Sequence, residues 1–369
     1  MTLIRAQQFV IIVTAVVLTQ LSALAQTPTP KPKATPDDEV IKVESRLVVV
    51  PVSVTDANGQ PVLGLTAKDF RIAEDGKEQA IENLGNADVV PLEIALLFDI
   101  SASTDTMFKF EQETAAKFLR DVMRANDRAT IFTVGERGVL VQSRDTAEKS
   151  MASISSIAPT KEQTAFYDAV RSAADYLKKN TPQGSRKVIV IISDGEDTNS
   201  EGIIKAIWNA ERKITDDVQG EKLRDLRVKA RDSAKVAEQA KVLKSLQDAD
   251  TVFYSINPGG SSYQLNKMSV FGQQNMQRFA DETGGTAFLP KFAPIDTKDT
   301  YQNENNVRKN QELLALIFRQ LANELRSQYL IQYYSESAFP LNKYVRLDVR
   351  LQNRVDLRIR ARQGYYVKN

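Results

Sequence analysis

Residues 94–103, with the sequence IALLFDISAS, decide the fold. A run of apolar residues ends at Asp99, and Ser101 and Ser103 follow it. Apolar runs that are almost unbroken are typical of strands in a parallel sheet covered by helices on both faces. Ligands of such sheets bind outside the carboxyl ends of the strands. We therefore expect a binding site at Asp99, Ser101 and Ser103.

Further apolar runs, separated by amphipathic segments, follow through the middle of the chain. Apolar runs predict further strands at 130–134, 188–192 and 251–256. Amphipathic segments between them predict helices at 106–124, 164–179, 201–213, 273–282 and 307–326. Strands that alternate with helices indicate an α/β domain with a doubly wound, mostly parallel sheet, which we place at about 91–327.

Both ends of the chain have a different pattern. Apolar and polar residues alternate over 48–54, where Pro51 favours an edge strand or a bulge. They alternate again over 345–351 and 355–361, which predicts a hairpin with one buried face. Segments 40–90 and 328–369 hold 51 and 42 residues, too few for two separate domains. We expect them to form one small β-sandwich into which the α/β domain is inserted.

The composition excludes several kinds of site. The chain has 369 residues, a net charge of +2, and neither Cys nor His. Disulfides, Cys/His zinc sites, Cys nucleophiles and Ser-His-Asp triads are therefore ruled out. The near-neutral charge gives no indication of nucleic-acid binding. Glycine-rich phosphate-binding motifs are also missing from the sequence.

The first 25 residues resemble a secretory signal. Arg5 precedes an apolar run, and Ala23-Leu24-Ala25 fits the rule for cleavage before Gln26. An uncleaved membrane anchor is the alternative. The prolines of residues 26–39 predict a linker of extended conformation. We therefore expect an exported protein, either periplasmic or secreted.

Two further segments stand out. Residues 221–247 predict a long charged helix, which either folds back on 201–213 as a helical hairpin or forms a partner-binding arm. We treat about 201–250 as a helical insertion. The stretch from Lys343 to Asn369 is rich in arginine. Its charge favours either weak contact with an anionic envelope surface or a simple solvated sheet face.

Oxygen-bearing side chains come together at the predicted carboxyl edge of the sheet. Asp194 follows the strand at 188–192, and Thr164 lies where a helix begins. With Asp99, Ser101 and Ser103 they can form a cage of hard oxygen ligands, which suits Mg²⁺, with Mn²⁺ or Ca²⁺ as alternatives. In the simpler interpretation, Asp99 caps a helix and Asp194 belongs to a turn. Glu196 and Asp197 are expected in a solvated turn.

These motifs resemble a known family. DISAS at 99–103, TAFYDA at 164–169 and ISDG at 192–195 resemble the metal-ion-dependent adhesion site of the von Willebrand factor type A (VWA) domain. With RQGY at 362–365, the chain is similar to the bacterial VWFA-related proteins of acidobacterial type. The resemblance implies a six-stranded sheet with one antiparallel edge strand near 139–141.

The resemblance also implies roles for the site residues. Ser101 and Ser103 would bind the metal directly, Thr164 directly or through water, and Asp99 and Asp194 would mostly hold waters and orient the serines. The sequence departs from the family pattern at Ala102 and at Glu162-Gln163, where many members have glycine. Thr160 is therefore a substitute ligand to consider.

The most consistent function is a non-enzymatic module that binds a carboxylate of a partner protein through Mg²⁺. The metal ligands would be neutral hydroxyls, which leaves the ion free to attract an external anion. A metal-assisted hydrolase using the same oxygens is one alternative, although it would need a positioned base. A structural scaffold with a vestigial site is the other.

Overall fold

The computed structural model describes residues 46–101, 105–160, 162–212, 214, 219–258, 267–295, 298–352 and 354–368. The predicted signal peptide, the Pro-rich linker and Ser103 lie outside these residues. No helix among the described residues is long and apolar enough to cross a membrane.

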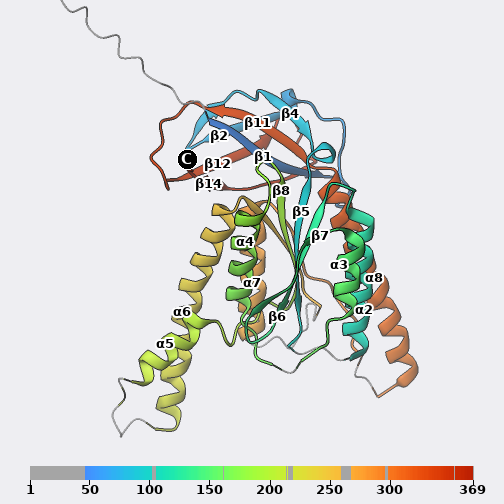
Figure 1. Ribbon diagram of the computed structural model, residues 1–369, viewed down its shortest axis with the longest axis vertical. Helices are drawn as coiled ribbons and strands as arrows, with labels where there is room; N and C mark the ends of the chain where they lie inside the picture. The colour runs from blue at the N-terminus through green and yellow to red at the C-terminus, as the bar shows by residue number, and fades with distance from the viewer. Residues whose placement is uncertain are drawn as a thin grey trace, which may run out of the picture. The chain divides into compact units, whose positions relative to one another are not determined.

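A six-stranded sheet forms the centre of the α/β domain (Figure 1). Its strand order is β10 (Ala287–Phe288), β9 (Thr251–Ile256), β8 (Arg186–Ile192), β5 (Leu92–Asp99), β6 (Arg128–Val134) and β7 (Gly138–Asp145). β7 pairs antiparallel with β6, whereas every other neighbouring pair is parallel. The mostly parallel sheet and its antiparallel edge strand are both confirmed.

Alternate side chains of the central strands face two separate cores. Leu96 and Phe98 contribute to one core, and Ala95 and Leu97 to the other. Glu93 is buried in the same strand, and Arg144 neutralises it through two hydrogen bonds of 2.7 Å. A charged residue is therefore tolerated inside an apolar strand because its partner on β7 is fixed.

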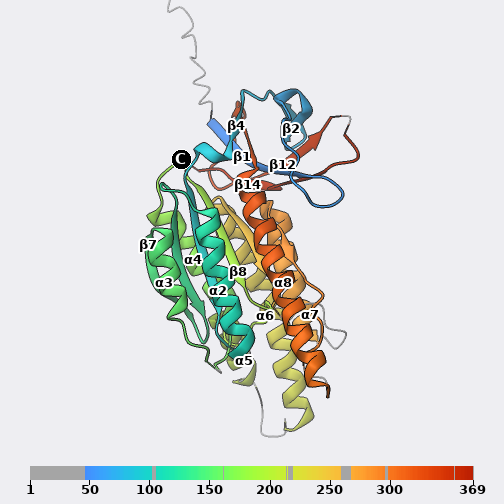
Figure 2. The same cartoon turned by 90° about the vertical axis from the view of Figure 1, so that its right-hand side faces the viewer.

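Helices cover both faces of the sheet (Figures 1 and 2). One face carries α2 (Asp105–Val122), α3 (Ala147–Ser155) and α8 (Thr300–Arg326), and the other carries α4 (Phe166–Asn180), α6 (Glu221–Asp248) and α7 (Lys267–Thr283). The short helix α3 has no counterpart among the helices predicted from the sequence. Both α7 and α8 begin about two turns earlier than predicted. The first turns of α8 are polar and carry no apolar periodicity, so they resemble a loop.

The helix α5 (Glu201–Glu211) packs along α6. Buried residues of α6 begin only at Lys235, so its first half extends past the domain core (Figure 1), whereas α5 still contributes Ile203 to that core. The helical hairpin expected here is present.

Two antiparallel sheets lie beside the amino ends of the central strands. Their orders are β13-β1-β11-β4 and β14-β12-β2-β3. The strands are β1 (Arg46–Thr55), β2 (Phe70–Glu74), β3 (Lys77–Gln79), β4 (Asn83–Asn86), β11 (Tyr329–Ser335), β12 (Tyr344–Leu351), β13 (Arg358–Ala361) and β14 (Gly364–Tyr366). Each sheet joins strands from both ends of the chain, as β1 pairs with β11 and β2 with β12.

The two sheets share one core. The alternating valines of β1 are at most 4% exposed and pack against Ile72, Tyr333 and Val345 from other strands. Inside this core Glu74 accepts hydrogen bonds from Tyr333 Oη at 2.7 Å and Ser335 Oγ at 2.8 Å. Tyr365 Oη, from β14 in the same sheet as Glu74, donates a third, at 2.5 Å. Three hydroxyl groups therefore stabilise one buried carboxyl group.

The predicted hairpin of 345–351 and 355–361 is wrong. β12 pairs with β2 and β14, whereas β13 pairs with β1 in the other sheet. The alternating pattern shows that both strands bury one face, but it does not specify which strand is the neighbour.

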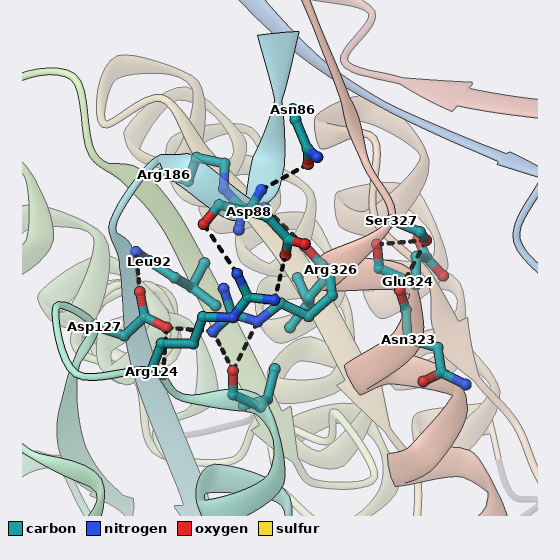
Figure 3. A network of polar contacts seen from close by, with 12 residues as sticks. Asn86, Asp88, Leu92, Arg124, Asp127, Arg186, Asn323, Glu324, Arg326 and Ser327 are labelled. Atoms are coloured by element: carbon teal, nitrogen blue, oxygen red, sulfur yellow. Dashed lines mark hydrogen bonds and ion pairs between the residues drawn. The ribbon is translucent and has the colours of Figure 1, made fainter. Parts of the chain in front are cut away.

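A polar network joins the sandwich to the α/β domain (Figure 3). Asp88, in the short helix η3 (Ala87–Val89), forms an ion pair of 2.8 Å with Arg124. Asp127 accepts the backbone N–H of Leu92 at 2.7 Å and pairs with Arg326 at the end of α8. These contacts lie at the amino ends of the central strands, opposite the predicted site.

Candidate functional site

The predicted site begins where β5 and β8 end. Phe98 pairs with Ile192 in the parallel register, so the residues that follow, Asp99 and Ser193, are neighbours at the carboxyl edge of the sheet. This is the edge at which ligands of open α/β sheets bind.

Asp99 organises this edge through hydrogen bonds. Its Oδ1 accepts from the backbone N–H of Ser101 at 3.0 Å and from Ser101 Oγ at 2.6 Å. Its Oδ2 accepts from Ser193 Oγ at 2.6 Å. Burial raises the pKa of Asp99 above its ordinary range, and the hydrogen bonds from Ser101 and Ser193 oppose that rise. The carboxyl group thus holds two hydroxyl groups in fixed positions.

Asp194 lies in the tight turn after β8. Its Oδ1 accepts the backbone N–H of Glu196 at 2.9 Å, and Ser193 Oγ accepts that of Gly195 at 3.0 Å. Burial raises the pKa of Asp194 to about 6, and the negative charges of Asp99 and Glu196 add to the effect. Asp194 and Asp99 are therefore close enough to interact electrostatically.

Thr164 lies just before α4 and is 7% exposed. Its carbonyl oxygen accepts from the backbone N–H groups of Thr198 at 2.9 Å and Asn199 at 3.0 Å. The loop after Asp194 is thereby attached to the start of α4. Among the described residues no hydrogen bond joins Thr164 to Asp99, Ser101 or Asp194.

The expectation that Asp197 lies in a solvated turn is wrong. Asp197 is 1% exposed and accepts the backbone N–H of Tyr167, in the first turn of α4, at 2.9 Å. It also accepts from Ser200 Oγ at 2.5 Å. An acidic group at the N-terminus of a helix satisfies free N–H groups and stabilises the helix dipole. Asp197 therefore fixes α4 rather than facing water.

Thr160 has another partner. Its backbone N–H and its Oγ1 both donate to the carbonyl oxygen of Ile100, at 2.7 and 3.3 Å. It therefore holds the loop that follows β5, next to Asp99.

Two site residues could not be identified from the sequence. Ser193 shares Asp99 with Ser101, and the pairing of strand ends would have revealed it only once the order of β5 and β8 was known. Glu111 of α2 is 3% exposed. Burial and the negative charge of Asp99 raise the pKa of Glu111 to about 8. It lies on a helix whose pattern resembles an ordinary amphipathic surface.

The donors at this edge fit a hard cation. They are hydroxyl and carboxylate oxygens, the ligands that Mg²⁺ and Ca²⁺ prefer. In the described part of the chain, Asp99 and Asp194 form no ion pair with Lys or Arg. The described residues contain no cluster of three or more acidic side chains arranged around a metal position. Any cation here would therefore depend on the hydroxyl groups.

Residues 94–196 match the family model for the von Willebrand factor type A domain. This stretch of the chain belongs to a VWA domain. The match extends from β5 to the turn after β8, and so includes Asp99, Ser101, Thr164 and Asp194. The remaining part of the central sheet, with β9 and β10, lies beyond the matched residues.

Several solved structures are similar to this chain at low identity. An aerotolerance-related membrane protein from Bacteroides fragilis is 15% identical, with 60% of this chain and 98% of that chain covered and a TM-score of 0.32. The PilB minor pilin from Streptococcus sanguinis is 13% identical, with 65% and 63% covered and a TM-score of 0.42.

Proximal thread matrix protein 1 from the mussel byssus, in a structure with a zinc-occupied MIDAS motif, is 10% identical, with a TM-score of 0.38. Here 69% of this chain and half of that chain are covered. No curated protein matches the chain.

Proposed function

We propose that this protein is an exported, non-enzymatic binding module whose VWA domain recognises a carboxylate of a partner protein through a divalent cation. The residues that would hold the cation are Asp99, Ser101, Ser103, Thr164 and Asp194. Mg²⁺ is the preferred ion, with Mn²⁺ or Ca²⁺ as alternatives. The observation that carries the proposal is the hydrogen-bonded group of Asp99, Ser101 and Ser193 at the carboxyl edge of the sheet.

The chain's own residues have distinct tasks in this proposal. Asp99 orients the hydroxyl groups of Ser101 and Ser193 and supplies negative charge beneath them. Asp194 adds a second carboxyl group from the neighbouring strand end. A bound cation would supply an electrophilic centre with an open position for an anionic group of the partner. Because its direct ligands would be mainly neutral hydroxyls, that centre would retain much of its charge.

The domain limits belong to the same proposal. The VWA domain would span 91–327, with a helical insertion at about 201–250, and the sandwich would consist of 40–90 and 328–369. Strand pairing between the two ends supports this division. The signal peptide at 1–25 would direct the protein to the periplasm or the exterior.

Calorimetric titration of the full chain with MgCl₂ tests the site directly. Asp99→Ala should weaken metal binding roughly 10–100-fold, as the loss of a residue that orients metal ligands typically does. Asp121→Ala is the matched control, because it removes an exposed carboxylate at the far end of α2 and should leave binding unchanged.

A pull-down from the native envelope, with Mg²⁺ and then with chelator, tests the function. We expect partners to be recovered only with Mg²⁺ and only by the protein that retains Asp99. Recovery of the same partners under both conditions would contradict metal-dependent adhesion. Equal Mg²⁺ affinity of the wild type and Asp99→Ala would instead contradict the site itself, and would favour a scaffold with a vestigial site.

A further inference from the structure

The deeply buried acidic residues of this protein have partners inside the fold, with one exception. In the described part of the chain, seven acidic residues are at most 3% exposed. Four of them form ion pairs with basic residues, namely Glu93 with Arg144, Asp127 with Arg326, Glu238 with Arg171 and Glu324 with Arg360. Two more accept hydrogen bonds from hydroxyl groups, namely Glu74 and Asp197. A buried carboxyl group needs such a partner to offset its loss of hydration.

Glu111 of α2 is the exception. It is 3% exposed, yet it forms no hydrogen bond or ion pair with any described residue. Among the described charges, the negative charge of Asp99 acts on it, and no Lys or Arg opposes that charge. A carboxyl group in such surroundings destabilises the fold, and an uncharged side chain would cost less at the same place. Groups of this kind gather at functional sites, where they are retained for a task other than packing.

The position of Glu111 connects it with the edge of the sheet that carries Asp99. On the inward face of α2 it lies three residues after Phe108 and four residues before Ala115, and both of these belong to the core. The rings of Phe108 and Phe98 meet edge to face, with their centroids 5.1 Å apart. Phe98 directly precedes Asp99 at the end of β5. The inward face of α2 is therefore fixed against this strand end, and Glu111 follows one helical turn after the contact.

Asp99 and Glu111 also act on each other electrostatically. Burial and the negative charge of Asp99 raise the pKa of Glu111 to about 8, so the two carboxyl groups resist being ionised together. A divalent cation at the edge of the sheet would remove this conflict, because it attracts both carboxylates. The pair therefore fits a site that a cation completes.

We propose that Glu111 is a positioning residue of the cation site, whose carboxyl group strengthens cation binding through Asp99 without being a ligand itself. This inference rests on the proposed function. It assigns to that site a residue of α2, outside the motifs at 99–103, 164–169 and 192–195. In this arrangement the fold gives up some stability in order to bind the cation more tightly.

Glu111→Gln tests this role, because glutamine has nearly the shape of glutamate but cannot be ionised. Calorimetric titration of the full chain with MgCl₂ should show an affinity about tenfold weaker than that of the wild type. Thermal unfolding at neutral pH in the presence of chelator should show a higher melting temperature. A carboxyl group whose pKa is raised by folding destabilises the fold above its unfolded pKa, and the substitution removes that effect.

Glu113→Gln is the matched control. Glu113 is an exposed residue of the same helix, so its substitution should change neither the Mg²⁺ affinity nor the melting temperature. Glu111→Asp is a second variant, which keeps the carboxyl group on a side chain that is one methylene shorter. It should bind Mg²⁺ more tightly than Glu111→Gln does.

The outcomes separate this inference from the proposed function. A purely structural role of Glu111 predicts a lower melting temperature and an unchanged Mg²⁺ affinity in Glu111→Gln, and this result would overturn the inference alone. Equal Mg²⁺ affinity of Glu111→Asp and Glu111→Gln would also overturn it, because the carboxyl group would then be irrelevant. A wild type that does not bind Mg²⁺ would overturn the proposed function, and the inference with it.

Discussion

At the scale of single residues, Gly195 is a position that only glycine fits. Its φ is +75°, and a Cβ there would lie 2.7 Å from the carbonyl oxygen of Gly272 in the second turn of α7. The turn that carries Asp194 therefore packs directly against a helix backbone. A side chain at this position would displace the turn, the helix or both.

Gly195→Ala should therefore lower the free energy of unfolding by about 1–3 kcal/mol and also weaken Mg²⁺ binding. Gly184→Ala is the matched control, because Gly184 has a φ of +79° but a Cβ added there would meet no described atom within 4 Å. Urea unfolding and Mg²⁺ titration of both variants separate steric displacement from backbone strain. Equal losses of stability, with unchanged metal affinity, would show that the contact with Gly272 is unimportant.

Residue patterns place Asp99 and Ser101 close together in sequence, whereas the other contacts of the candidate site depend on distant segments. The spacing of Asp99 and Ser101 brings them together on one loop, and their hydrogen bonds agree with that prediction. Ser193 was missed because its contact with Asp99 depends on which strands are neighbours. Asp197 was misjudged because its partner, the N-terminus of α4, precedes it by 30 residues in sequence. Residue spacing predicts which side chains of one loop lie close together. Contacts between distant loops can be predicted only once the order and register of the strands are known.

At the scale of elements, Asp250 links the loop before β9 to the C-terminal strands. Arg362 and Lys368 approach its two oxygens at 2.8 and 2.6 Å. The positive charges of these two cations lower the pKa of Asp250 below its usual range. A lowered folded-state pKa stabilises the fold above the unfolded value, about 3.9, and that contribution is lost as pH falls through the folded value.

Asp250→Asn should therefore lower the melting temperature at neutral pH, and the difference from the wild type should shrink as the pH falls below about 3.9. Asn also tolerates the positive φ of 49° at this position, so the backbone is preserved. Melting curves across the acid range measure the effect, with Asp248→Asn as a control whose partner, Lys244, is on its own helix. A difference that stays constant with pH would mean that the charge of Asp250 is not responsible.

Most elements could be predicted, but their neighbours could not. Apolar runs located the strands of the central sheet because these strands are buried on both faces. The error over β12 and β13 has a physical cause, since a strand in either sheet of a sandwich shows the same alternation. The polar first turns of α8 were not predicted because they lack apolar packing. They are stabilised instead by a helix cap, in which Asp299 Oδ1 accepts the backbone N–H of Gln302.

At the scale of the whole described structure, the sandwich needs both ends of the chain. Removing residues 328–369 would delete the partners of β1 and β2 and expose the valines of β1. We expect the truncated protein to lose protease resistance over 46–86, while β5 to α8 remain resistant because the two cores of the sheet lie within that range.

Limited proteolysis with mass spectrometry, with the full chain as reference, checks this expectation. Continued protection of 46–86 after truncation would contradict the shared core. The size of the two end segments was sufficient to predict that they combine, since neither is long enough to bury a core alone. Size could not reveal how Glu74 joins the two sheets through Tyr333 and Ser335.

The split sandwich also has a consequence for biosynthesis. Arg46 pairs with Ser335, so β1 leaves the ribosome long before β11 has been made. At about 5–20 residues per second, this delay is on the order of tens of seconds. During that time the central α/β domain is still being made, while β1 remains an unpaired strand with an apolar face, which is prone to aggregation. We therefore expect the nascent chain to need a holding chaperone until its last strands emerge.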